Sequence, residues 1–102
     1  MPSYRCRLQI GDLRPGHAPQ EVMDTAEAAL SATHLVAAKD IEVVSRVPRI
    51  VLRITVPSSN PQAEDAEARQ AAANMAEAVA EVATTGRLDV LRRDGGRWIP
   101  VG

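Results

Sequence analysis

The segment Arg49-Ile50-Val51-Leu52-Arg53-Ile54-Thr55-Val56 is the most strand-like run in the chain, and the fold that we expect follows from it. Branched aliphatic side chains fill it, as strands favour, and those on one side are Ile50, Leu52, Ile54 and Val56. The two arginines project to the opposite side. Because the charged residues lie on one side of the strand, the pattern predicts a sheet with one covered face and one face open to solvent.

Two further segments show strand patterns at the ends of the chain. Residues 4–10 alternate apolar with polar side chains and place Arg5 and Arg7 away from the apolar set, and the pattern is expected to break at Gly11-Asp12. Residues 88–93 alternate in the same way near the C-terminal end. A tight turn rich in glycine follows, and it would let residues 98–101 return as a short edge strand.

The fourth strand pattern lies directly before the opening segment. Residues 41–47 alternate, and a turn at Val47-Pro48 would pair Glu42 with Arg53. Proline is disfavoured at that place in a two-residue turn, so a slightly longer loop is equally compatible. We expect an antiparallel hairpin in either case.

Two segments between the strands carry helix signals. Pro19 lies where a first-turn proline is tolerated, and an apolar stripe then runs to about residues 31–34. Asn60 is a cap candidate before Pro61, and the alanine-rich stretch that follows should end before Thr85-Gly86, where glycine is the expected terminator. Acidic residues occupy the early turns of both helices, as helix N-termini favour.

Composition indicates the general class of protein. The chain has 102 residues, of which 45% are hydrophobic and 2% aromatic, so we expect a single domain, 1–102, with a modest aliphatic core. A net charge of −1 argues against general binding to nucleic acid or to acidic membranes. One cysteine and the lack of a signal peptide or a membrane-spanning apolar run predict a soluble cytoplasmic protein.

The order strand, helix, strand, strand, helix, strand divides into two similar halves. It resembles the ferredoxin-like βαββαβ fold, which implies an α+β protein with a four-stranded antiparallel sheet, two helices on one face and room for a short C-terminal fifth strand. The loop from Asp12 through Pro15-Gly16 is similar to the strand-to-helix loop of ACT-type regulatory modules. No ligand contacts follow from this similarity, because proline-glycine is first of all a turn signal.

In such a fold the first and third strands are central, so their outward residues share the middle of the open face. The binding residues that we expect there are Arg5, Arg7, Arg49, Arg53, Val44, Val51, Leu91 and Trp98. Trp98 should also lie close enough to Arg93 for a cation–π contact. Acidic residues dominate both helices, so the opposite side would be negative. Solvated arginines that merely shield the sheet are the competing interpretation.

No catalytic, metal or cofactor motif stands out. His17 and His34 have no second ligand at metal-binding spacing, and Cys6 falls on the buried side of its strand. We therefore expect a non-enzymatic regulatory, ligand-binding or protein-interaction module without a metal, a cofactor or catalytic residues. Its expected partners are a second copy, bound as a homodimer through the sheet face, and an acidic protein or small anionic ligand at the arginines.

Two alternatives stay open. Removal of Met1 would leave Pro2 as an N-terminal amine, which resembles the general base of the tautomerase superfamily and implies an enzyme. Binding of single-stranded nucleic acid is the third hypothesis. It ranks last because the central strands offer no aromatic side chain on which bases could stack.

Overall fold

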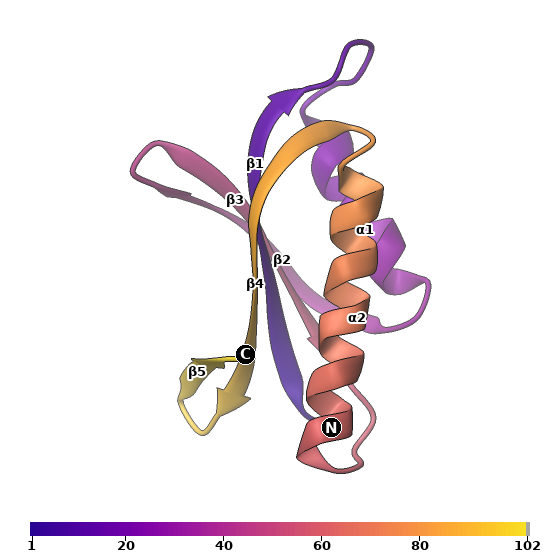
Figure 1. Cartoon of the computed structure of the whole chain (residues 1–102), viewed down its shortest axis with the longest axis vertical. Coiled ribbons are helices and arrows are strands. Elements are labelled where there is room, and N and C mark those ends of the chain that lie inside the picture. The colour runs from indigo at the N-terminus through magenta and orange to yellow at the C-terminus, as the bar shows by residue number, and fades with distance from the viewer. Residues whose placement is uncertain (102) are drawn as a thin grey trace.

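The computed structural model describes residues 1–101. In chain order the elements are β1 (Ser3–Leu13), α1 (Gln20–Ser31), β2 (Leu35–Val44), β3 (Val47–Thr55), α2 (Pro61–Val79), β4 (Ala83–Asp94) and β5 (Arg97–Pro100). The α+β class expected from the sequence is confirmed. Both helices lie on the same side of the sheet (Figure 1).

The sheet has five antiparallel strands in the order β2-β3-β1-β4-β5. The four-stranded ferredoxin-like sheet expected from the sequence is therefore wrong. β5 is a regular edge strand, because it pairs with β4 from Leu91↔Pro100 to Asp94↔Arg97. The turn between these strands contains Gly95 at φ 61°, a left-handed conformation that glycine adopts without steric cost.

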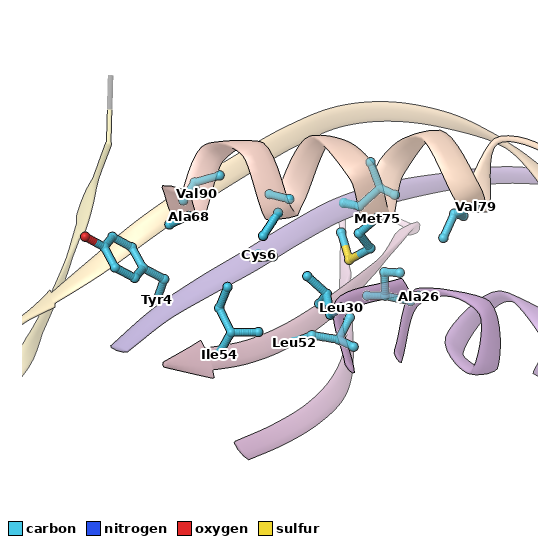
Figure 2. Close-up of a cluster of buried hydrophobic side chains, with 14 of the residues drawn as sticks. Tyr4, Cys6, Ala26, Leu30, Leu52, Ile54, Ala68, Met75, Val79 and Val90 are labelled. Carbon is cyan, nitrogen blue, oxygen red and sulfur yellow. The ribbon is translucent and has the colours of Figure 1, made fainter. Parts of the chain in front are cut away.

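The hydrophobic core lies between the sheet and the two helices. Figure 2 shows Cys6 of β1 and Leu52 of β3 in one cluster with Leu30 and Met75 of the helices. All four side chains are 0% exposed. Small residues such as Ala68 let α2 approach the sheet closely, which compensates for the lack of phenylalanine in the chain. Burial of each large aliphatic side chain contributes about 1.5–3 kcal/mol, so this cluster holds the two layers together.

β1 and β4 are longer than their sequence patterns indicated. β1 continues through Gly11, and Thr85-Gly86 lies inside β4 and does not end α2. Both glycines allow close approach of the two strands. A Cβ at position 11 would collide with Oγ1 of Thr84, and one at position 86 would lie 2.7 Å from Oε1 of Gln9. The residues that indicated chain breaks are therefore strand residues at crowded positions.

The β2-β3 hairpin has a different register from the one expected. Its turn is Ser45-Arg46, with φ of 51° and 66°, in place of Val47-Pro48. Glu42 consequently pairs with Arg49 and not with Arg53, a shift of four residues along β3. Because the shift is even, each side chain keeps the face that its alternation predicts. The hairpin projects away from the helices (Figure 1).

Candidate functional site

Strand pairing places the predicted binding residues on the face that the helices leave uncovered. Arg5 pairs with Arg53 on one side and with Leu91 on the other, and Arg7 pairs with Val51. Directly opposed residues project to the same face of a sheet. Register puts three more on this face: Arg49, Val44 and Trp98. We call the surface around the four arginines and Trp98 the arginine face; Val44 lies apart from it, beside the hairpin turn.

Two of the four arginines of the arginine face form ion pairs, and Arg7 shares its partner Asp89 with Arg87. Arg7 Nη2 lies 3.2 Å from Asp89 Oδ2, and Arg49 Nη2 lies 3.3 Å from Glu42 Oε1. The other two arginines form the cross-strand pair on β1 and β3. That pair has no carboxylate within ion-pair distance in residues 1–101. Arg5 and Arg53, together with Arg93 beside Trp98, are therefore the guanidinium groups of this face that have no carboxylate partner in the described chain.

Arg5 and Arg53 lie against the indole ring of Trp98. Their Cζ atoms are 4.3 Å and 5.7 Å from the ring centroid. The contact of Arg93 with the same ring, expected from the sequence, is present and is the longest of the three, at 5.9 Å. A guanidinium over an indole gains about 0.5–1 kcal/mol at an exposed site. Stacking also leaves the N–H groups at the guanidinium edge able to donate to another molecule.

The apolar part of the arginine face is covered. Val51 and Leu91 are each 8% exposed although they project away from the helices, because arginine stems flank and shield them. Of the apolar residues expected to contribute to binding, Val51 and Leu91 are therefore largely covered, whereas Val44 is 49% exposed. Nε of Arg53 is buried and has no hydrogen-bond partner in the described part of the chain. The Nε atoms of Arg7 and Arg49 are in the same state, so this feature does not distinguish the arginines that lack an ion pair.

A hollow of about 240 Å³ opens beside β2 on the same face. Arg5 and Arg53 line one part of it, Val51 contributes apolar surface, and Asp40 and Glu42 contribute carboxylates from the edge strand. The sequence analysis missed Asp40, because the expected strand began one residue later. The hollow therefore combines two unpaired cations with acidic side chains.

A second polar cluster lies on the helix side of the sheet. The Tyr4 hydroxyl donates to Asp65 Oδ1 at 2.6 Å, and Arg92 Nη1 donates to the Tyr4 oxygen at 2.7 Å and to Asp65 Oδ1 at 3.0 Å. Arg92 Nη2 donates to Glu64 Oε1 at 3.0 Å, and Glu64 also accepts from the Ser59 backbone at 2.8 Å. The cluster ties the start of α2 to β1 and β4. No local pattern in the sequence links these distant residues.

These contacts shift the pKa values within the cluster. Burial and then the hydrogen bond to Asp65 raise the pKa of Tyr4 to about 12. The Ser59 N–H, assisted by Arg92, holds the pKa of Glu64 below its usual value. Burial acts to raise the pKa of Asp65, but hydrogen bonds from Tyr4 and Arg92 outweigh it and lower the pKa. These contacts move each of the three pKa values away from neutral pH. A general acid or base would operate near neutral pH, so we interpret the cluster as structural.

Other reactive side chains occupy structural positions. Burial raises the pKa of the Cys6 thiol to about 12, which suits a core residue and not a nucleophile. His34 Nε2 lies 2.7 Å from Glu67 Oε2, and His17 Nδ1 lies 3.0 Å from Glu21 Oε2. Within the described chain, no three His, Cys, Asp or Glu side chains gather as metal ligands. Neither α1 nor α2 is long and apolar enough to cross a membrane.

Exposed apolar surface gathers elsewhere, in the part of β2 that approaches the turn of the β2-β3 hairpin. Ile41 and Val43 are 61% and 67% exposed. A hollow of about 370 Å³ next to Ile41 is lined mainly by aliphatic side chains, among them Leu13 and Val22. It offers few polar groups that could orient or select a ligand. The chemistry that can discriminate between ligands therefore lies on the arginine face.

Comparisons of the chain with protein-family models, with curated proteins and with solved structures gave no match. The charge and geometry of the arginine face are therefore the basis for the function proposed below.

Proposed function

We propose that the protein is a non-enzymatic interaction module that binds acidic groups of a partner on the arginine face. One observation carries this proposal. Arg5 and Arg53 stand opposite each other on the central strands, and neither has a carboxylate partner in residues 1–101. Two adjacent guanidinium groups without a counterion form a surface that gains by binding an anion.

Electrostatics favour occupation of this arginine pair. Two like unit charges 4 Å apart repel by about 1 kcal/mol in water and by about 4 kcal/mol near a protein surface. An acidic group between Arg5 and Arg53 would replace this repulsion by attraction to both. Each charge-assisted hydrogen bond contributes about 1.5–3 kcal/mol. A few such contacts would give most of the affinity, and salt would weaken them.

The charge of the helix layer directs an acidic partner toward the sheet. α1 carries three acidic residues and no basic one. α2 carries four acidic residues and a single basic residue, Arg69. An acidic partner is repelled by this layer and attracted to the arginine face, so charge alone selects the orientation of binding.

A homodimer through the sheet face, expected from the sequence, stays a prediction. A two-fold contact centred on the face would bring Arg5 and Arg53 close to the same residues of the second copy. Val51 is covered, so little apolar area is left to drive that contact. An acidic partner therefore fits the positive charge of the face better than a second copy of the chain does.

The enzyme and nucleic-acid alternatives also stay predictions. The Pro2 carbonyl accepts from the Val56 N–H at 2.9 Å, a strand-like contact that assigns it no chemistry. Trp98 is the aromatic side chain of the arginine face, and Arg5 already stacks on its ring, which reduces the surface left for a base.

The test uses Trp98, the only tryptophan of the chain, as a fluorescent reporter. An oligoglutamate peptide is titrated at low salt and binding is followed by Trp98 fluorescence and calorimetry. We expect Arg53→Ala to weaken binding roughly tenfold or more, the loss of one charge-assisted hydrogen bond. The control Arg69→Ala removes an arginine side chain from the helix layer and should leave the affinity unchanged. Equal affinities for Arg53→Ala and the wild type, or equal losses in the two variants, would refute the proposal.

A further inference from the structure

The two unpaired arginines are arranged so that one ligand group can contact both. Arg5 and Arg53 are direct cross-strand partners, and such pairs have Cβ atoms about 4.5–5.5 Å apart. Their guanidinium carbons lie 4.3 Å and 5.7 Å from the centroid of the same Trp98 ring. The two N–H forks therefore converge on one small region of the arginine face.

A phosphomonoester matches this arrangement more fully than a carboxylate does. One carboxylate has two oxygens and a single charge, which one guanidinium fork satisfies. A phosphomonoester has three terminal oxygens and a charge of about −1.5 to −2 at neutral pH. It can accept hydrogen bonds from both forks and neutralise both cations.

We propose that the hollow beside β2 binds a phosphomonoester dianion held between Arg5 and Arg53. This inference rests on the proposed function and names the acidic group that the arginine face recognises. The volume of about 240 Å³ lies below the range of about 300–1,000 Å³ typical of pockets for drug-sized ligands. It suits one phosphorylated group and not a large nucleotide cofactor.

Asp40 adds selectivity to the hollow. Glu42 is neutralised by Arg49 at 3.3 Å, whereas Asp40 has no ion pair in the described chain, and its Oδ1 accepts from the Ile41 N–H at 2.8 Å. That bond fixes a negative charge at the rim. A phosphomonoester with a positive group beside it would satisfy the arginines and Asp40 together, while Asp40 opposes a dianion that lacks such a group.

The dianion also predicts a pH dependence that a carboxylate ligand would not show. The second pKa of a phosphomonoester is about 6, so binding should weaken between pH 7.5 and 5.5 as the monoanion forms. No histidine lines the hollow. Besides the two arginines, its charged lining residues are Lys39, whose Nζ contacts Glu27, and the carboxylates Asp40 and Glu42. Protonation of these carboxylates would strengthen the binding of an anion. A loss of affinity near pH 6 must therefore come from the ligand.

The experiment compares three probes by Trp98 fluorescence and calorimetry: a phosphoserine peptide with one flanking lysine, the same peptide with glutamate for phosphoserine, and phenyl phosphate. At pH 7.5 the phosphoserine peptide should bind at least about fivefold tighter than the glutamate peptide, because it carries the larger charge and the third oxygen. That advantage should fall about fourfold by pH 5.5, where roughly a quarter of the phosphate is still dianionic. Arg5→Ala and Arg53→Ala should each remove it, and Asp40→Asn should tighten the binding of phenyl phosphate. Asp24→Asn on α1 removes a carboxylate from the other layer and should change nothing.

Each outcome decides one question. Equal affinity for the phosphoserine and glutamate peptides at pH 7.5, or an advantage that is unchanged at pH 5.5, overturns the inference and leaves the proposed function standing. Failure of all three probes together with oligoglutamate overturns both. Phenyl phosphate that binds as tightly as the peptide assigns the hollow to small phosphomonoesters, and preference for the peptide assigns it to a phosphorylated protein.

Discussion

Replacing Tyr4 by phenylalanine removes one oxygen from the cluster that joins α2 to the sheet. The hydroxyl is part of a fully buried residue, donates to Asp65 at 2.6 Å and accepts from Arg92 at 2.7 Å. Hydrogen bonds to charged groups contribute about 1.5–3 kcal/mol each. Arg92 and Asp65 still contact each other at 3.0 Å in the variant, which limits the loss. We expect Tyr4→Phe to lower the free energy of unfolding by about 2–3 kcal/mol.

The raised pKa of Tyr4 makes its contribution depend on pH. Its value of about 12 in the fold against an ordinary 10.0 arises first from burial, which penalises the charged phenolate, and then from the hydrogen bond to Asp65, and it corresponds to roughly 3 kcal/mol against ionisation in the fold. Because the folded pKa is the higher one, this contribution is fully present below pH 10 and is lost between pH 10 and 12. Cys6, whose pKa is also raised to about 12, titrates equally in both proteins and cancels from the difference.

The assay is urea unfolding of the wild type and of Tyr4→Phe, followed by circular dichroism at pH 7 and at intervals up to pH 12. The difference should be about 2–3 kcal/mol at pH 7 and should shrink toward zero as the pH approaches 12. A double-mutant cycle with Asp65→Asn should show coupling of about 1 kcal/mol or more. A variant within about 0.5 kcal/mol of the wild type at pH 7, or a deficit that persists at pH 12, would show that the hydroxyl does not stabilise the fold as we argue.

Three further outcomes are expected. Leu52→Ala opens a cavity at a 0% exposed position and should cost about 2–5 kcal/mol in urea unfolding; a cost below 1 kcal/mol would contradict the core as described. The pKa of Glu64 is lowered in the fold, so ionised Glu64 stabilises the fold above its unfolded pKa, and this stabilisation is lost as the pH falls through the folded pKa. Glu64→Gln should therefore flatten the acid limb of the stability curve measured by thermal unfolding. If the homodimer prediction holds, light scattering after size exclusion should give a dimer that Val51→Glu splits, and monomers in both cases would end that prediction.

The face that each strand residue occupies could be predicted from the sequence, whereas the partner that it pairs with could not. Alternation has a period of two, so the side of Arg5 and Arg53 survives any even shift in register. The hairpin shifted by four residues because Ser45-Arg46 adopts the left-handed turn without glycine or asparagine to indicate it. The ion pair of Glu42 therefore moved from Arg53 to Arg49. This shift leaves Arg53 unpaired and creates the candidate site.

Contacts between distant residues explain what the sequence analysis missed. Gly11 and Gly86 looked like chain breaks, but each lies where two paired strands leave no space for a Cβ. The stacking of Arg5 on Trp98 depends on β5 being a full edge strand. The sequence predicted residues 98–101 only as a possible short strand, so it gave no reason to expect Trp98 over the two central strands. Only the longer contact, with the neighbouring Arg93, was therefore predicted.

The most direct test of the central claim observes the arginine side chains themselves. Nuclear magnetic resonance spectra of the Nε–Hε groups and of the Trp98 indole would be recorded while the phosphoserine or oligoglutamate peptide is added. We predict the largest shifts at Arg5, Arg53 and Trp98, and none at Arg92, which is held by Glu64 and Asp65 on the other side of the sheet. Shifts that instead cluster on α1, α2 or the hairpin turn at Ser45-Arg46, with Arg5 and Arg53 unmoved, would contradict the account.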